Sequence, residues 1–526
     1  MALRIYNSLT RSETEFQPLE PGKVRMYVCG ITSYAPSHIG HARAYVAFDV
    51  VYRWLKRHYL VTFVRNFTDI DDKIIKAAHA AGEDPMTLSE RFIRMFGEDM
   101  NELGNAVPDV EPRVTTHIPE IIRMIETLEQ QGYAYRLEGD VYYEVKKFQA
   151  YGRLSGRSLD QLEAGARVEV DERKRSPYDF ALWKAAKPGE PFWESPFGKG
   201  RPGWHIECSA MAEKYLGVRF DLHGGGKDLL FPHHENELAQ SCAAHGTPEF
   251  ANVWMHNGFV NLMPEGCPKC EAPVPEGAKV DVGLTCAACG YTFTEEDFKM
   301  SKSRGNFYPI REVLARYEGE ALRLFFLTTH YRKPINFSHV LLEDAEKRLD
   351  KNYETLQEIG RFTHQQTFTP GKSFAGIFGF DPLEKFKEAM DSDFNTAVAL
   401  AEAAEVFKLA NDLLRGDENK RLGRVLSPEE TSRLLLDCQE MIRSMGDILG
   451  LWQAEPAAYL ERRKIAKSSS LTMTPAQIEA LIVERKEARN RKDFRRSDQI
   501  RDELKAKGIV LKDAKDGSTT WAVEES

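Results

Sequence analysis

The chain has 526 residues, of which 42% are hydrophobic and 29% charged, and its formal net charge is −9. This length exceeds what one hydrophobic core supports, so we expect three or more domains. The acidic balance excludes a protein that holds nucleic acid by non-specific charge alone, because such proteins are basic overall. Since the sequence has neither a run of about 20 apolar residues nor a signal-peptide pattern at its start, we expect a cytoplasmic protein without membrane contact.

The first buried element expected is a β-strand at residues 24–28, where apolar and polar residues alternate before a turn at Gly30. A helix follows, because apolar residues recur at helical spacing from Ile39 onward. His38 and His41 would lie on one side of its first turn. Backbone N–H groups and the positive end of the helix dipole favour phosphate there. A neutral imidazole can donate a hydrogen bond to phosphate without adding a fixed charge.

A strand at residues 61–67 and a helix from about Asp71 continue this βαβ order, which predicts a parallel, doubly wound α/β sheet with ligands at the carboxyl ends of its strands. An amphipathic helix at 118–131 and a hairpin at 134–145, turning at Gly139-Asp140, interrupt the order. We assign them to an inserted subdomain of about residues 95–200. The glycine-rich run 223–226 follows a strand-like stretch, and it either lets the backbone approach a base or ribose or forms a tight turn.

The eight cysteines do not form the disulfide framework of a secreted protein. Two Cys-x-x-Cys pairs separated by fifteen residues have the spacing of a zinc ribbon: Cys267, Cys270, Cys286 and Cys289. A reduced thiol cluster without metal is the alternative. Cys242 and Cys438 lie alone in apolar, helix-like contexts, so we expect them to be small buried side chains.

The segment Lys299-Met300-Ser301-Lys302-Ser303 is polar and precedes Gly305, which suits a loop that closes on a triphosphate, although it could equally be a solvated loop. After His330 the pattern becomes mainly helical, with a polar linker near residues 365–373. We therefore expect a catalytic domain at 1–335, a helical bundle at 336–455 and a C-terminal unit at 472–526. Residues 485–507 read as one helix with a surplus of basic residues that Gly508 ends, either an RNA-binding face or an ordinary solvated one.

The histidine pair and the lysine-serine segment, in this order, resemble the two signature motifs of class I aminoacyl-tRNA synthetases. The segments 29–32, 203–211, 223–226 and 231–237 are similar to those of cysteinyl-tRNA synthetases. The resemblance extends along nearly the whole chain, except at 262–298, where it leads us to expect only a short link. It implies a Rossmann-like class I catalytic domain with an inserted subdomain and a zinc-ribbon insert, followed by an α-helical bundle and a small anticodon-binding unit.

The resemblance also implies ATP-dependent ligation of L-cysteine to tRNA(Cys) through a cysteinyl-adenylate. The residues implied at the ATP phosphates are His38, Gly40, His41, Lys299 and Lys302. Of these, His38, His41 and Lys302 would be catalytic. Mg²⁺ would bind together with ATP. The implied ligands of an active-site zinc are Cys29, Cys208, His233 and Glu237, of which His233 and Glu237 are spaced as on one helix face. Trp204, His223 and Asp228 would surround the cysteine, and Arg489, Asp498 and Asp513 would contact tRNA.

A zinc-bound substrate would explain how cysteine is distinguished from serine, because pocket shape separates near-isosteres by only about 10². Zinc stabilises a thiolate at neutral pH, so an editing domain is unnecessary. Two alternatives remain: a cysteine–amino-sugar ligase similar to this family, which lacks the C-terminal part, and a non-catalytic RNA-binding paralogue. We expect a monomer with a second zinc in the ribbon, which either restricts how the signature loop closes on ATP or only stabilises the chain.

Overall fold

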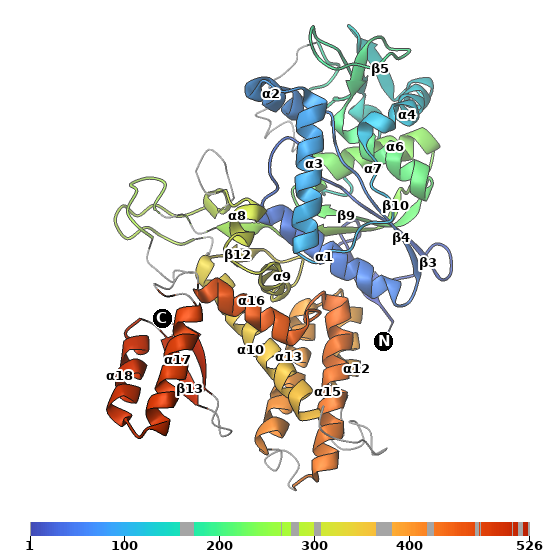
Figure 1. Cartoon of the computed structure of the whole chain (residues 1–526). Helices are drawn as coiled ribbons and strands as arrows, with labels where there is room; N and C mark the ends of the chain where they lie inside the picture. Colours follow the sequence, from blue (N-terminus) through green and yellow to red (C-terminus); the bar gives the residue numbers. More distant parts are fainter. Residues whose placement is uncertain are drawn as a thin grey trace. The chain divides into compact units, whose positions relative to one another are not determined.

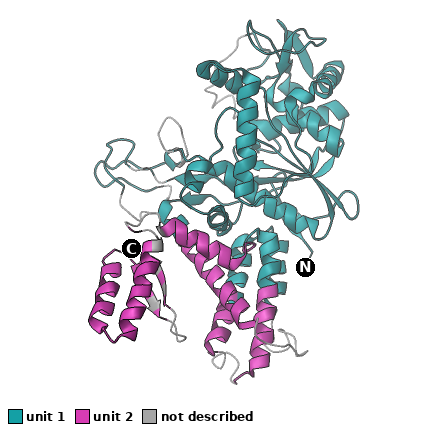
Figure 2. Cartoon of the chain, in the orientation of Figure 1, with its two compact units in different colours: residues 1–346, 378–406, 441–451 teal, residues 347–377, 407–440, 452–526 magenta. Residues whose placement is uncertain are grey.

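The computed structural model describes residues 2–157, 173–262, 264, 266–274, 283–298, 307–363, 381–417, 425–468, 473, 475–507, 509–513 and 519–523. The predicted loop with Lys299 and Lys302, and the linker near residues 365–373, therefore lie outside the described residues. The chain divides into two compact units (Figure 2). Unit 1 comprises residues 1–346, 378–406 and 441–451, and unit 2 comprises residues 347–377, 407–440 and 452–526.

Four parallel strands form the central sheet of unit 1, in the order β10-β9-β3-β4 (Figure 1). They are β3 (Lys23–Val28), β4 (Leu60–Arg65), β9 (Phe220–Gly226) and β10 (Ala251–Asn257). The chain runs from β3 to β4 in one direction and from β9 to β10 in the other, so the order reverses between β3 and β9. Open parallel sheets bind ligands at such a point, outside the carboxyl ends of the strands. The predicted doubly wound parallel sheet is confirmed.

Helix α1 (Ile39–Lys56) follows β3 and begins at His38, as predicted. Its apolar positions at helical spacing, among them Val46, Val50 and Trp54, are buried. The predicted strand at 24–28 is also confirmed by β3, whose last three residues are all buried. The tight turn considered for the glycine-rich run is wrong, because residues 223–226 continue strand β9. The other alternative, a close approach of this backbone to a base or ribose, stays a prediction.

The inserted segments form a second, antiparallel sheet in the order β5-β6-β7-β8. Its strands are β5 (Ala134–Leu137), β6 (Asp140–Tyr143), β7 (Phe180–Ala185) and β8 (Gly200–Pro202), and α4 (Ile118–Gln130) precedes them. The predicted hairpin is present, but its two-residue turn is Glu138-Gly139, one position earlier than expected. Both turn residues have positive φ, 52° and 91°, and this favours glycine at the second position.

The other strands form three small pairs: β1 (Arg4–Asn7) with β2 (Ser12–Glu15), β11 (Val260–Leu262) with β12 (Ile335–Phe337), and β13 (Ile509–Asp513) with β14 (Thr519–Val523). The remaining helices of the first 338 residues are α2 (Asp72–Ala81), α3 (Pro85–Glu102), α6 (Trp204–Leu216), α7 (Glu235–His245), α8 (Ile310–Leu314) and α9 (Gly319–Leu327). Short helical turns are η1 (Val114–Thr116), η2 (Val145–Lys147), η3 (Leu230–His234) and η4 (Glu295–Phe298).

The later part of the chain is mainly helical, as predicted. Its helices are α10 (His339–Thr363), α12 (Pro382–Asp391), α13 (Thr396–Arg415), α15 (Pro428–Leu449), α16 (Pro456–Ser468), α17 (Pro475–Asn490) and α18 (Phe494–Lys505). The prediction of a single basic helix at 485–507 is wrong, because the helix is interrupted between the end of α17 and the start of α18. Lys492 has a φ of +62°, and the Asp493 side chain accepts the Arg496 N–H at the start of α18.

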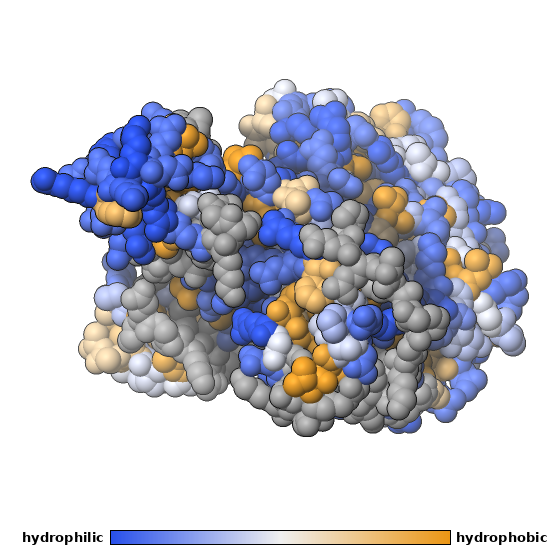
Figure 3. Space-filling view, turned by 60° about the horizontal axis from the view of Figure 1, so that its bottom comes forward, coloured by the Kyte–Doolittle hydropathy of each residue, from blue (hydrophilic) through white to orange (hydrophobic). Residues whose placement is uncertain are grey.

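The face of the molecule in Figure 3 is mostly hydrophilic, with hydrophobic residues in small separate groups. Exposed large hydrophobic residues such as Leu60, Val107 and Val425 are spread along the sequence. Among the helices that the structure describes, none is both long enough and apolar enough to cross a lipid bilayer.

Candidate active site

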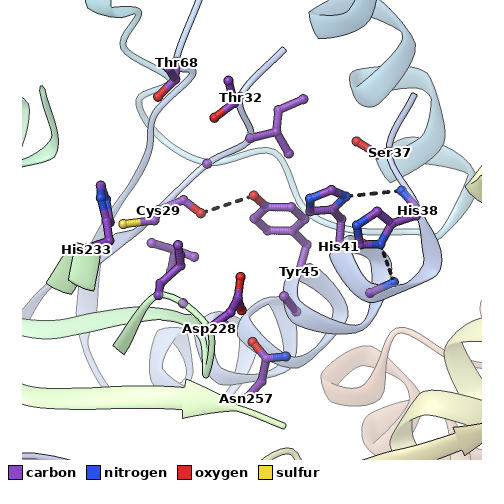
Figure 4. Close-up of a pocket in the computed structure, with 18 of the residues that line it drawn as sticks. Cys29, Thr32, Ser37, His38, His41, Tyr45, Thr68, Asp228, His233 and Asn257 are labelled. Carbon is purple, nitrogen blue, oxygen red and sulfur yellow. Dashed lines mark hydrogen bonds between the residues drawn. The ribbon is translucent and has the colours of Figure 1, made fainter. Parts of the chain in front are cut away.

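A cavity of about 410 Å³ lies at the carboxyl ends of the central strands. The residues that follow each strand contribute to its wall: Cys29 after β3, Asn66 after β4, Asp228 after β9 and Gly258 after β10. The starts of α1 and α6 add His38, His41 and Trp204. Figure 4 shows Cys29 and His233 on one side and His38 and His41 on the other, with Tyr45 and Asp228 between them. The volume is typical of a small-molecule site.

The two histidines cap helix α1. His38 Nδ1 accepts the Gly40 N–H at 3.1 Å, and His41 Nδ1 accepts the His38 N–H at 3.2 Å. The rings stack with their centroids 3.9 Å apart. Because Nδ1 is an acceptor in both rings, the ring proton lies on Nε2, which makes Nε2 a hydrogen-bond donor. This arrangement suits a phosphate at the helix start.

The chain that follows the predicted signature loop returns next to these histidines. Phe307 lines the cavity and contacts the His38 ring edge-on, with centroids 5.3 Å apart. Ile39 N donates to Tyr308 O at 3.1 Å, and Ile310 N donates to Ser37 O at 2.9 Å. Lys302 itself lies outside the described residues, five positions before Phe307 in the sequence.

Two glycines allow close approaches at this edge of the sheet. A Cβ on Gly30 would lie 1.5 Å from the carbonyl oxygen of Asn66, and a Cβ on Gly225 would lie 2.7 Å from Cε1 of His234. No side chain fits at either distance. The Asn66 side chain accepts the Gly30 N–H at 2.9 Å, so the residue after Cys29 is tied directly to the end of β4.

Buried thiol, imidazole and carboxylate groups gather at the other end of the cavity. The Sγ atoms of Cys29 and Cys208 are 3.9 Å apart. His233 Nε2 lies 3.0 Å from Glu237 Oε1, and that oxygen is 3.5 Å from Cys29 Sγ. A tetrahedral zinc with Zn–S bonds of about 2.3 Å separates two sulfurs by about 3.8 Å. The distance between the two thiols fits such a shell.

Two overlapping sets of four residues bring possible ligand atoms within 4.8 Å of one another. One set is Cys29, Cys208, His233 and Glu237, and the other is Cys29, His223, His234 and Glu237. Cys208 and His233 are among the described residues that line the cavity, whereas His223 and His234 are not. A catalytic metal keeps a position open to its substrate, so the first set, which the resemblance implies, fits better.

The electrostatics of the cluster favour a cation. Burial and the neighbouring Cys208 raise the pKa of the Cys29 thiol. Burial opposes ionisation of Glu237, but the charges of His223 and His233 hold the pKa of its carboxyl well below the usual value. Burial likewise opposes the charge on His233, yet Glu237 and Cys208 raise the pKa of the imidazole to about 10. A metal ion would neutralise these buried acids, and it would displace the His233 proton on ligation.

Further histidines support the cluster, and no sequence motif indicated their supporting roles. His223 Nε2 lies 2.8 Å from Glu237 Oε2, so it holds the carboxylate oxygen that faces away from Cys29. The ring of His223 stacks on Trp254 with centroids 4.5 Å apart. His234 Nε2 lies 3.3 Å from Cys29 Sγ, and its Nδ1 is 2.8 Å from His256 Nε2. Such partners orient metal ligands.

The predicted neighbours of the cysteine separate into two groups. Trp204 and Asp228 line the cavity, and the Trp204 ring stacks on His233 with centroids 4.4 Å apart. His223 is fully buried behind Glu237, not at the cavity wall. Sequence reasoning missed Tyr45, whose hydroxyl donates to Cys29 O at 3.2 Å and which lines the cavity.

The residues expected to contact tRNA lie in the C-terminal part of unit 2. Asp513 on β13 accepts from Arg485 Nη1 at 2.8 Å and from Arg489 Nη1 at 3.1 Å, both on α17. Hydrogen bonds from Arg485 and Thr519 hold the pKa of the Asp513 carboxyl well below its usual value. Asp498 is exposed on α18. Arg489 and Asp513 therefore form one ion-paired group.

Comparisons with known proteins point to one protein family along nearly the whole chain. The family model described as the class I (C) tRNA synthetase catalytic domain matches residues 15–270 and 289–347. A DALR domain matches residues 385–453, and a cysteinyl-tRNA ligase anticodon binding domain matches residues 472–521. The Cysteine--tRNA ligase of Pelobacter propionicus is 49% identical over 537 residues, which cover 99% of this chain and 100% of the relative. That of Geotalea uraniireducens is 48% identical, with 100% of both chains covered.

Solved structures share the fold at low sequence identity. The methionyl-tRNA synthetase of Mycobacterium tuberculosis, in complex with methionyl-adenylate, has a TM-score of 0.56 and 15% identity, covering 86% of this chain and 95% of that one. LeuRS of Agrobacterium radiobacter, in a ternary complex, has a TM-score of 0.54 and 12% identity, covering 84% and 87%. These likenesses concern the fold alone.

Proposed function

The chain belongs to the cysteine–tRNA ligase family, which joins L-cysteine to tRNA(Cys) with ATP, and we propose that the cavity forms the cysteinyl-adenylate of this reaction. One observation carries the proposal: a single cavity has Cys29, Cys208 and His233 at one end and His38 and His41 at the other. Cysteine would bind with its sulfur at the first end and its carboxylate toward ATP at the second.

The metal ion at the first end would be zinc, held by Cys29, Cys208, His233 and Glu237. Two thiols, an imidazole and a carboxylate are all ligands that zinc accepts. Bound there, zinc would stabilise the thiolate of the substrate at neutral pH and bind a serine hydroxyl far less well. The protein orients this shell: His223 fixes one oxygen of Glu237, and Trp204 stacks on His233.

The remaining groups of the substrate meet polar residues of the cavity wall. Asp228, between the two ends, would accept a hydrogen bond from the α-ammonium group of cysteine (Figure 4). Tyr45 fixes the backbone of Cys29 and with it the distance between the cluster and α1. This positioning brings the cysteine carboxylate to the α-phosphate, and positioning of this kind supplies much of the rate acceleration in such reactions.

ATP would bind with Mg²⁺ at the start of α1, beside Gly40. The Nε2–H groups of His38 and His41 would donate to phosphate oxygens, where negative charge moves toward the leaving pyrophosphate. Lys302, with Lys299, would stabilise that charge from the segment that precedes Phe307 in the sequence. The protein supplies no covalent nucleophile in this scheme.

The second half of the reaction transfers cysteine to tRNA. We assign the catalytic role to residues 1–335, a connecting helical bundle to 336–455, and anticodon recognition to 472–526. Arg489, oriented by Asp513, and the exposed Asp498 would contact the RNA. The match of the anticodon binding domain at 472–521 argues against the amino-sugar ligase, and the intact histidine pair and thiol cluster argue against a non-catalytic paralogue.

The proposal extends to the setting of the enzyme. The enzyme would act as a monomer. A cytoplasmic location suits cysteine ligands that must stay reduced. The test is cysteine-dependent ATP–pyrophosphate exchange followed by charging of tRNA(Cys). Exchange with cysteine but not with serine is expected, and exchange that is equal with both amino acids would overturn the assignment of the cluster.

A further inference from the structure

The ribbon comprises the described residues 266–274 and 283–298, which form yellow-green loops in Figure 1. Its four cysteines have their Sγ atoms within 4.8 Å of one another: Cys267, Cys270, Cys286 and Cys289. Cys267 Sγ lies 3.6 Å from Cys289 Sγ, and Cys270 Sγ lies 3.7 Å from Cys286 Sγ. Two sulfurs bound to one tetrahedral zinc lie about 3.8 Å apart. The thiols thus already have the spacing of a metal shell.

The first pair of cysteines lies in a tight turn. Cys267 N donates to Ala272 O and Glu271 N donates to Cys267 O, both at 2.8 Å. An isolated bridge between Gly266 and Pro273 closes the turn. Glu271, directly after the second cysteine, has a φ of +59°, which is unfavourable for a residue with a side chain. The turn is therefore maintained against a local cost.

The second pair lies in a turn of the same construction. Cys286 N donates to Tyr291 O and Gly290 N donates to Cys286 O, again at 2.8 Å, and Thr285 bridges Thr292. Gly290 occupies the position of Glu271 and has a φ of +71°. Two equivalent turns that each present a pair of thiols to one point indicate a site built for a single ion.

The apolar core of the ribbon is too small to fold it. Its buried residues are Cys267, Phe293 and Phe298, with partly buried neighbours around them. Units of this size need a metal or disulfides for stability. When a site does not exist in the unfolded chain, the free energy of metal binding contributes directly to folding.

We propose that the four ribbon thiolates bind a zinc ion of their own, a structural metal site separate from the active site. Four thiolates in a tetrahedron take zinc or iron; zinc fits because the ligation of cysteine to tRNA transfers no electrons. The match to the catalytic family model is interrupted at residues 271–288, so the interruption contains Cys286 and the other three cysteines lie beside it. The site itself does not rest on the proposed function, since none of the four cysteines lines the described cavity; only the choice of zinc over iron uses it.

The two zinc sites differ in their exposure to reagents. Cys270 is exposed, and Cys286 and Cys289 are partly exposed, whereas the side chains of Cys29 and Cys208 are buried. A thiol-directed organomercurial would therefore displace the ribbon zinc first. With a chromogenic chelator as readout, the full-length protein should release one equivalent quickly and a second slowly. Absence of the fast equivalent would contradict the proposal, and this measurement needs no variant.

Metal analysis of variants locates each ion. The full-length protein should carry two zincs, Cys270→Ser/Cys286→Ser should carry one, and Lys269→Ala, in the same turn, should keep both. Cys208→Ser should lose the other ion. A single zinc in the parent that Cys208→Ser removes, or one iron in the ribbon, would overturn the proposal. If Cys208→Ser kept both ions while the ribbon variant lost one, the ribbon site would stand and the proposed active-site zinc would fail.

Discussion

His38 and His41 each use Nδ1 to accept a backbone N–H at the start of α1, and their rings stack 3.9 Å apart. The same two rings therefore cap the helix and present Nε2–H donors at the cavity. Helix capping and phosphate recognition therefore use different nitrogens of the same two rings. A substitution can separate the two roles only if it keeps the acceptor at Nδ1 and removes the donor at Nε2, or the reverse.

Replacement of His41 by asparagine or glutamine makes this separation. In His41→Asn the amide oxygen can take over the acceptor role of Nδ1, but the donor at Nε2 is lost. We expect an unchanged melting temperature and a loss of ATP–pyrophosphate exchange of about 10² or more. His41→Gln, which can place an N–H near Nε2, should retain more exchange. If the asparagine variant matched the parent, the phosphate role of His41 would be wrong.

Lys302 should contribute to adenylate formation although it lies outside the described residues. Loss of one contact to the transition state costs roughly 3 kcal/mol, so Lys302→Ala should reduce exchange by about 10² at an unchanged cysteine KM. Arg316→Ala, which removes an exposed cation outside the cavity, is the control. Equal exchange rates in the two variants would remove Lys302 from the mechanism.

Asp513 should matter for tRNA and not for adenylate formation. Asp513→Asn removes the charge that holds Arg485 and Arg489. We expect the KM for tRNA(Cys) to rise several-fold, because Arg489 loses its fixed orientation, while cysteine-dependent exchange is unaffected. Asp502→Asn changes the charge by the same amount on the neighbouring helix α18. An equal effect of both variants would show that only the net charge matters.

Asp350 should stabilise unit 2 in a pH-dependent way. It accepts hydrogen bonds from Tyr459 and Arg463 at 2.8 and 2.9 Å, and from Lys467 at 2.8 Å. Burial opposes its charge, but Arg463 and Lys467 lower the pKa of the carboxyl below its usual value. Removal of one member of a buried ion pair costs roughly 3 kcal/mol. Asp350→Asn should therefore speed hydrogen exchange in α16 by about 10².

The sign of the pH dependence follows from the lowered pKa. Asp350 contributes its full stability above the unfolded pKa of about 4 and loses it as the pH falls through the folded value. The difference in exchange between the parent and Asp350→Asn should therefore be constant from about pH 5 to 7 and shrink below pH 4. Glu461→Gln, at an exposed position of α16, should show little effect. A difference that grows toward low pH would refute the role of Asp350.

Local patterns predicted the elements that carry the site. The alternation in β3 and the helical spacing after Ile39 placed His38 and His41 correctly at a helix start, because both signals arise within one turn or strand. The two Cys-x-x-Cys pairs predicted a cluster that the structure brings together. The prediction of the thiol end of the cavity rested only on the family resemblance. Cys29 and Cys208 are separated by many helices and strands, so no local pattern connects them.

Other features needed the three-dimensional structure. Residues 223–226 continue β9 because they pair with residues 254–257 of β10, and a side chain at Gly224 or Gly225 would collide with Phe48 or His234. Turn propensity contains neither reason. The contact between His223 and Glu237 joins strand β9 to helix α7, so it depends on how these two elements pack. The interruption between α17 and α18 contains Lys492, whose positive φ is a backbone conformation that lysine seldom adopts. Sequence patterns therefore did not predict it.

X-ray absorption at the zinc edge tests the central claim most directly, namely that the active-site cluster binds the sulfur of the substrate. In Cys270→Ser/Cys286→Ser, all zinc should belong to the cluster that contains Cys29 and Cys208, which gives two sulfur ligands. Addition of cysteine should raise the number of sulfur ligands to three, and addition of serine should leave it at two. A count that stays at two when cysteine is bound would contradict the account.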